Sequence, residues 1–180
     1  MRKLISHLFI SLDGVVESPD TFVRPNVYAD FPDLMRDTIA EQDTILLGRK
    51  MYQEWSQFWP GSKIEPFASF INNNPKYVVS STLRNLEWNH STLLDGDLAD
   101  AIGKLKAQPG KTIGVHGSIS LVQSLLLAGL LDELRFIQAP AIAGHGRRLI
   151  DHQGAALQLD LQYSRATPTG LQYLVYTPRP

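Results

Sequence analysis

The segment from Gly110 to Ile150 constrains the fold of this chain more than any other part of the sequence. It begins with a short β-branched run at 112–115, and after Gly117 and Ser118 apolar residues recur at helical spacing until Gly129. A glycine just past the last periodic residue is a typical helix end, and a second apolar strand follows. The order of strand, glycine turn, helix and strand predicts an α/β fold.

The glycine turn is also a candidate ligand site. At Gly117, where a strand ends and a helix begins, a ligand can approach the backbone, and the unpaired N–H groups of the first helical turn favour an anion such as phosphate. A plain turn with Ser118 as the N-cap is the alternative interpretation. Neither the Walker A loop nor the dinucleotide fingerprint fits, because Leu105 and Leu149 stand where those motifs need glycine.

A second strand-to-helix junction has the same form. The apolar run 44–47 leads into Gly48, Arg49 and Lys50 at the predicted start of a helix. Two cations at a helix N-terminus oppose the helix dipole, and a bound polyanion would make the arrangement favourable. Arg49 can grip phosphate with its planar fork, so we interpret the junction as a phosphate site. Two solvated surface charges are the alternative.

A third cluster follows the strand pattern at 77–79, where the hydroxyl residues Ser80, Ser81 and Thr82 come together. Hydroxyls at a strand end can bind phosphate or ribose, and they are also common turn formers. If these strands are parallel, their carboxyl ends share one edge of the sheet, which is where open α/β sheets bind ligands. The three clusters therefore predict one anion site at that edge.

The rest of the chain predicts a mixed sheet flanked by helices. A buried first strand is expected at about 3–10, and helices near residues 31–42, 66–71 and 98–107. Asp30 is suited to cap the first of these helices. Near the C-terminus, apolar residues alternate with polar ones from 157 to 163, residues 168–170 are typical of a turn, and a second strand pattern follows at 171–176. This order predicts an antiparallel hairpin.

Length and composition limit the function classes. The 180 residues suffice for one substantial core, so we expect a single domain over 1–180. Near-neutral charge, with 17 basic and 18 acidic residues, offers no basic face for nucleic acid. The absence of cysteine excludes thiolate sites, and the histidines lack metal-ligand spacing, so no metal is predicted. No segment approaches the roughly 18 apolar residues of a membrane span, so we expect a cytoplasmic protein without a membrane partner.

Four motifs occur in a fixed order and together cover nearly the whole chain. They are Ser11-Leu12-Asp13-Gly14, Leu47-Gly48-Arg49-Lys50-Met51-Tyr52, Val79-Ser80-Ser81-Thr82, and His116-Gly117-Ser118 followed by 129–134 and 140–149. Through them the chain resembles the dihydrofolate-reductase-like superfamily, most closely the branch with the reductase domain of the bifunctional riboflavin-biosynthesis enzyme. The resemblance implies a three-layer α/β fold with a mostly parallel sheet, flanking helices and a C-terminal antiparallel hairpin.

The resemblance also implies an NADPH-dependent reductase that transfers hydride to a pterin-like or pyrimidine-like heterocycle. The zinc motifs of the fused deaminase are absent from this sequence, which disfavours the riboflavin-pathway enzyme itself but leaves a freestanding reductase as an alternative. Two positions depart from the family pattern, since Met51 replaces a frequent threonine and His116 a frequent glycine. A nucleotide-binding or regulatory protein without chemistry is the alternative. The NADPH contacts that the resemblance implies are Gly48, Arg49, Lys50, Met51, Ser80, Ser81, Thr82, His116, Gly117, Ser118 and Ile119.

Asp13 is the candidate catalytic residue because it follows an apolar strand and precedes a glycine. The resemblance implies that it holds or protonates the heterocycle, while an ordinary Asp-Gly turn is the alternative. Asp33 and Asp37 on the first helix compete for the role. The substrate contacts expected are Ser11, Asp13, Gly14, Trp55 and Phe58, although aromatic residues at helical spacing are also typical of a core.

A homodimer is expected for two reasons. Relatives commonly pair through sheet edges, and residues 125–127, 130 and 131 form an apolar leucine cluster. The alternative is that these leucines fill the core of one subunit.

Overall fold

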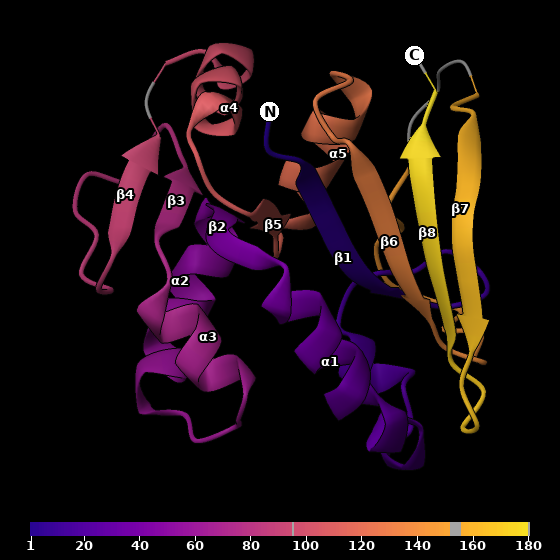
Figure 1. Ribbon diagram of the computed structural model, residues 1–180. Helices are drawn as coiled ribbons and strands as arrows, with labels where there is room; N and C mark the ends of the chain where they lie inside the picture. The colour runs from indigo at the N-terminus through magenta and orange to yellow at the C-terminus, as the bar shows by residue number, and fades with distance from the viewer. Residues whose placement is uncertain (95, 152–155, 180) are drawn as a thin grey trace.

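The computed structural model describes residues 1–94, 96–151 and 156–179, and its eight strands form one sheet in the order β4-β3-β2-β5-β1-β6-β8-β7 (Figure 1). From β4 to β6 all neighbours are parallel, whereas β8 is antiparallel to both β6 and β7. The predicted mixed sheet and C-terminal hairpin are confirmed. The strands are β1 (Leu4–Ile10), β2 (Gln42–Gly48), β3 (Lys76–Val79), β4 (Ser91–Leu94), β5 (Thr112–Val115), β6 (Glu133–Gln138), β7 (Leu159–Ala166) and β8 (Gln172–Pro178).

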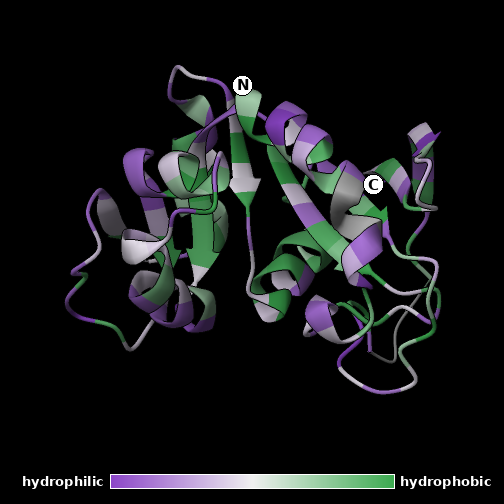
Figure 2. Cartoon of the chain, turned by 90° about the horizontal axis from the view of Figure 1, so that it is seen from below, coloured by the Kyte–Doolittle hydropathy of each residue, from purple (hydrophilic) through white to green (hydrophobic). Residues whose placement is uncertain are grey.

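Helices cover both faces of the sheet. Alternate residues of each inner strand point to opposite faces, so both faces are apolar and pack against helices. On β2, Leu46 packs into the core beneath α4 and α5, whereas Ile45 and Leu47 pack into the core beneath α2 and α3. Figure 2 shows the largely hydrophobic strands and the hydrophilic residues on the surrounding helices. In the described residues no helix is both long and apolar enough to cross a bilayer. The helices are α1 (Phe31–Ala40), α2 (Arg49–Phe58), α3 (Phe67–Asn73), α4 (Leu98–Ala107) and α5 (Ile119–Leu127).

The first helix begins one residue after Asp30, which is its N-cap residue by position but does not cap it through the side chain. The Asp30 side chain makes no capping hydrogen bond. Its Oδ2 instead accepts from the backbone N of Thr169 at 2.9 Å and from the Thr169 hydroxyl at 2.6 Å. Asp30 therefore ties the start of α1 to the turn between β7 and β8, since two donors from one residue outcompete a single local N–H.

The leucine cluster lies mostly inside the subunit. Leu125, Leu126 and Leu131 are at most 5% exposed and belong to the core beneath α4 and α5, whereas Leu127 is 50% exposed. The cluster therefore favours the core interpretation. Pairing through sheet edges stays a prediction that rests on the resemblance.

Candidate functional site

The three predicted clusters meet at one edge of the sheet. β2, β3 and β5 are parallel, so their carboxyl ends lie together, and a cleft of about 670 Å³ runs across them. The predicted residues that line this cleft are Gly48, Arg49, Lys50, Ser80, Ser81, Thr82 and Ser118.

The cleft depends on a close approach between two helix starts. The backbone N of Gly48 donates to the carbonyl of Gly117 at 2.8 Å. A Cβ atom at position 48 would lie 2.5 Å from the Oγ of Ser118 and 3.0 Å from its backbone N. Glycine at position 48 therefore lets α2 and α5 begin side by side, with the positive ends of both helix dipoles at the cleft.

Neither helix start is capped by a side chain at its N-cap. Gly48 has no side chain to offer, and in the described part of the chain Ser118 makes no capping hydrogen bond. The first N–H groups of α2 and α5 thus remain suitable donors for an anion.

The lining of the cleft is basic. Arg49 and Lys50 are exposed on the first turn of α2. Arg147, Ser120 and Ser124 also line the cleft and were not predicted. Among the described lining residues three are basic and none is acidic. Residue 147 lies within segment 140–149 of the fourth motif, but sequence reasoning missed its role because nothing in that segment indicates that the loop returns to the cleft.

Four predicted cofactor residues do not line the cleft, namely Met51, His116, Gly117 and Ile119. Met51 packs against the core beneath α2 and α3. A Cβ at Gly117, where φ is +107°, would lie 2.8 Å from the Cε of Met51, so glycine is needed there. The ring of His116 lies among Trp55, Phe67 and Phe70, with its Nε2 2.8 Å from the Oε1 of Gln42.

The environment of His116 predicts a pH effect on stability. Burial lowers the pKa of His116 from 6.5 to about 4. Between these values the unfolded chain binds a proton that the folded protein excludes, so this group makes the protein less stable as the pH falls from 6.5 toward 4. An NMR titration of the folded protein should give His116 a midpoint near pH 4. A midpoint near 6.5 would contradict the buried placement of the ring.

Asp13 lies in the turn after β1, and its carboxylate is extensively hydrogen-bonded. Oδ1 accepts from the Ser11 hydroxyl at 2.6 Å and from the backbone N of Ala143 at 2.9 Å, and Oδ2 accepts from the backbone N of Gly144 at 3.0 Å. The hydrogen bond from Ser11, followed by that from Ala143, lowers the pKa of Asp13 to about 2. The group is therefore ionised at neutral pH and can accept hydrogen bonds but has no proton to give.

The turn containing Asp13 is joined to the loop after β6 along its length. Val15 and Arg148 form an antiparallel bridge, and the backbone N of Val16 donates to the carbonyl of Arg147 at 3.0 Å. Glu17 Oε2 accepts from the backbone N of Arg147 at 3.0 Å. These contacts fix the 143–148 loop against segment 13–17.

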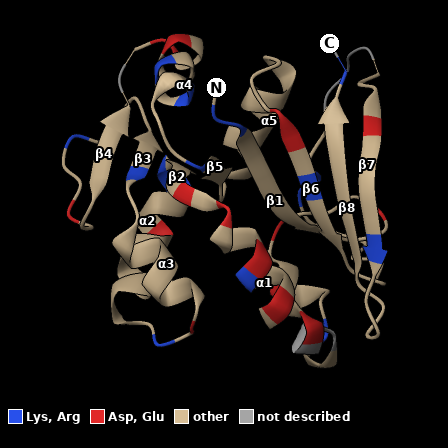
Figure 3. Cartoon of the chain, viewed as in Figure 1, with Lys and Arg blue, Asp and Glu red and all other residues tan. Residues whose placement is uncertain are grey.

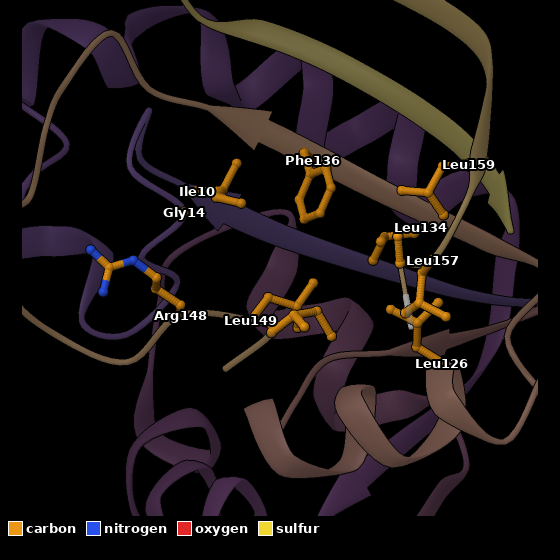
Figure 4. Close-up of a pocket in the computed structure, with 11 residues that line it drawn as sticks. Ile10, Gly14, Leu126, Leu134, Phe136, Arg148, Leu149, Leu157 and Leu159 are labelled. Atoms are coloured by element: carbon orange, nitrogen blue, oxygen red, sulfur yellow. The ribbon is translucent and has the colours of Figure 1, made fainter. Parts of the chain in front are cut away.

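A second pocket, of about 460 Å³, lies beside α5 and has mostly apolar walls. Figure 4 shows Arg148 at its rim, with the guanidinium directed away from Leu134 and Leu157. The Nε of Arg148 donates to the carbonyl of Asp13 at 2.8 Å. Apolar walls offer phosphate no partners, so the cleft is the better anion site.

The other predicted residues lie apart from the cleft. Acidic residues line α1 (Figure 3), but Asp33 is 76% exposed and pairs with Arg36 at 2.9 Å, and Asp37 is exposed. Trp55 packs against the core beneath α2 and α3, whereas Phe58 is 53% exposed. No group of three or more acidic or histidine side chains in the described residues is placed to hold a metal ion.

Comparison with known proteins agrees with the architecture. The family model of the RibD C-terminal domain matches residues 2–173. The protein YyaP of Bacillus subtilis is 28% identical over 180 residues, covering 97% of this chain and 94% of YyaP. The crystal structure of a protein from Shewanella sp. PV-4 has a TM-score of 0.75 at 20% identity, with 99% of both chains covered. Dihydrofolate reductase from Enterococcus faecalis, solved with NADP(H), has a TM-score of 0.60 at 13% identity, covering 99% of this chain and 97% of its own. The dihydrofolate-reductase-like fold is thus confirmed.

Proposed function

The chain belongs to the RibD C-terminal domain family, and we propose that it is a reductase that uses NADPH to reduce a pterin-like or pyrimidine-like heterocycle. One observation carries the proposal. Within a reductase fold, the described lining of the cleft holds three cations and no acidic residue, beside two helix N-termini. This arrangement suits the negative charge of a phosphate-rich dinucleotide.

The donor set of the cleft fits this cofactor. Arg49, Lys50 and the hydroxyls of Ser80, Ser81 and Thr82 would hold the phosphate on the adenosine ribose, which distinguishes NADPH from NADH. The backbone at Ser118 would approach the diphosphate. The two departures from the family pattern, Met51 and His116, have their side chains outside the cleft and so remove no donor from it.

When bound, NADPH supplies the hydride. The chain supplies binding and orientation, because the cleft lies across the carboxyl ends of β2, β3 and β5, and β5 is a neighbour of the central strand β1 in the sheet. Asp13 follows β1 and has three of the roughly four acceptor sites of a carboxylate filled. Its side chain is 21% exposed, and its Oδ2 also lies 3.8 Å from the Nη2 of Arg148. The remaining acceptor site would accept an N–H of the heterocycle and orient its ring.

The proposed placement of the phosphates is tested by Arg49→Ala. Arg49 is exposed at the first position of α2, and its Nη1 lies 3.4 Å from the Oε1 of Gln53, which leaves most of its donors for a ligand. Losing its hydrogen bonds to a charged group should weaken NADPH binding by roughly 1.5–3 kcal/mol. NADH, which lacks the ribose phosphate, should lose much less, so the NADPH preference should fall.

Fluorescence titration of both nucleotides measures the effect. Lys104→Ala, which removes one exposed positive charge from α4, is the matched control and should bind NADPH as the parent does. An Arg49→Ala protein with the parent's NADPH preference would refute the placement of the ribose phosphate. Tight NADPH binding without turnover on any pterin or pyrimidine would favour the non-catalytic alternative.

A further inference from the structure

Arg147 brings a third cation into the cleft from a separate part of the chain. It lies on the loop after β6, whereas Arg49 and Lys50 lie on α2. The Nη2 of Arg147 donates to the hydroxyl of Ser120 at 3.2 Å, on the first turn of α5. Ser124, four residues further along α5, lines the same cleft. Arg147 is thus associated with the wall of the cleft that α5 forms.

The guanidinium of Arg147 is suited to take a ligand. It is exposed, and among the described residues no carboxylate pairs with it. The nearby acid, Glu17, accepts from the backbone N of Arg147 instead. The planar fork therefore keeps donors that fit two oxygens of a phosphate group.

The backbone of Arg147 is held in place before any ligand arrives. Its N–H donates to Glu17 and its carbonyl accepts from Val16 at 3.0 Å. Earlier in the same loop, the backbone N–H groups of Ala143 and Gly144 donate to Asp13. A fixed backbone reduces the ordering cost of binding, so the side chain alone must settle around the ligand.

We propose that Arg147 binds the diphosphate of the dinucleotide and that Glu17 is a positioning residue which acts through Arg147. The proposal rests on the proposed function for the identity of the ligand. The diphosphate is chosen over the ribose phosphate because Arg147 contacts α5, whose N-terminal N–H groups face the same part of the cleft. Arg147 would therefore strengthen binding without selecting NADPH over NADH.

The test compares nucleotides that differ in their phosphates. Arg147→Ala should weaken NADPH, NADH and ADP alike, by about 10- to 100-fold, the range for hydrogen bonds to a charged group. It should leave adenosine 2′-monophosphate, which has no diphosphate, bound as in the parent. Arg147→Lys should recover only part of the affinity, since an ammonium group cannot bind two oxygens in one plane. Titration calorimetry gives each dissociation constant.

A double-mutant cycle tests the role of Glu17. Glu17→Ala should weaken ADP binding in the parent and have no further effect in the Arg147→Ala background. A role of Glu17 in stability alone would instead lower the melting temperature equally in both backgrounds and leave ADP affinity unchanged.

The outcomes separate this inference from the proposed function. If the parent binds ADP through Arg147 but does not bind NADPH, the inference stands and the proposed cofactor is wrong. If NADPH binds equally well to the parent and to Arg147→Ala, the inference is overturned while the proposed cofactor stands. A parent protein that binds neither NADPH nor ADP overturns both.

Discussion

Asp13→Asn is expected to lower turnover by about 10²-fold, because it removes the charged acceptor that would orient the heterocycle, and a misplacement of the bound substrate by about 1 Å can cost that much. The substitution keeps the size of the side chain but replaces the charged acceptor with a neutral amide. The NH2 group of the new amide would then face the backbone N–H of Ala143 or Gly144, so a hydrogen bond is replaced by two donors that face each other. NADPH oxidation with the most reactive compound from a panel of pterins and pyrimidines measures the loss, at saturating NADPH.

Two variants distinguish a contact between Asp13 and the substrate from a role of Asp13 in holding the 143–148 loop in place. Glu17→Ala removes a different contact to the same loop, the one at the backbone N of Arg147, and should cost much less turnover at saturating NADPH. Ser11→Ala removes the hydrogen bond from the Ser11 hydroxyl to the Asp13 carboxylate and the one that this hydroxyl accepts from the backbone N of Val15, but it keeps the charge of Asp13 and should therefore cost less turnover than Asp13→Asn. If Asp13→Asn and Glu17→Ala lost the same amount of turnover, Asp13 would be a structural turn residue.

Gly48→Ala should disrupt the cleft by sterics alone. Residue 48 has φ −80°, which alanine adopts readily, so no backbone strain enters. The added methyl group would lie 2.5 Å from Ser118 Oγ, which forces the starts of α2 and α5 apart. Overpacking of this kind costs about 1–3 kcal/mol. If this cost reduces the free energy of NADPH binding, the affinity for NADPH drops by about 10- to 100-fold.

A matched glycine and a second-site change make this prediction specific. Gly103 lies on α4, and a Cβ there would have nothing within 4 Å, so Gly103→Ala should leave NADPH binding unchanged. Adding Ser118→Gly to Gly48→Ala removes the Oγ and Cβ of Ser118 and should restore part of the affinity. Unchanged NADPH binding by Gly48→Ala alone would show that the two helix starts can separate without loss.

Local signals made much of the fold predictable. The helix expected at 98–107 begins and ends at those residues, because Asp97 caps it through the N–H groups of Ala99 and Asp100 and its apolar residues recur at helical spacing. The strand expected at 112–115 is likewise β5. The three clusters around Gly48, Ser80 and Gly117 were predicted to share an edge, and parallel pairing brings their strands together.

Features that depend on distant partners were not predictable. β4 is four residues long, half exposed and without alternation, and only its pairing with β3 makes it a strand. The carboxylate of Asp30 bonds to a turn 139 residues away instead of to its own helix. Arg147 enters the cleft because segment 13–17 holds its loop there, which no pattern around residue 147 reveals.

The central position of β1 has a consequence for how the protein is made. Within this sheet β1 is synthesised before the other strands, yet its neighbours are β5 and β6, with Leu4 opposite Ile113 and Ile5 opposite Glu133. At roughly 5–20 residues per second, the ribosome needs on the order of 5–20 seconds to add the residues between β1 and β5. During that interval the nascent chain carries an apolar strand with both edges unpaired, which exposes those edges to non-native pairing.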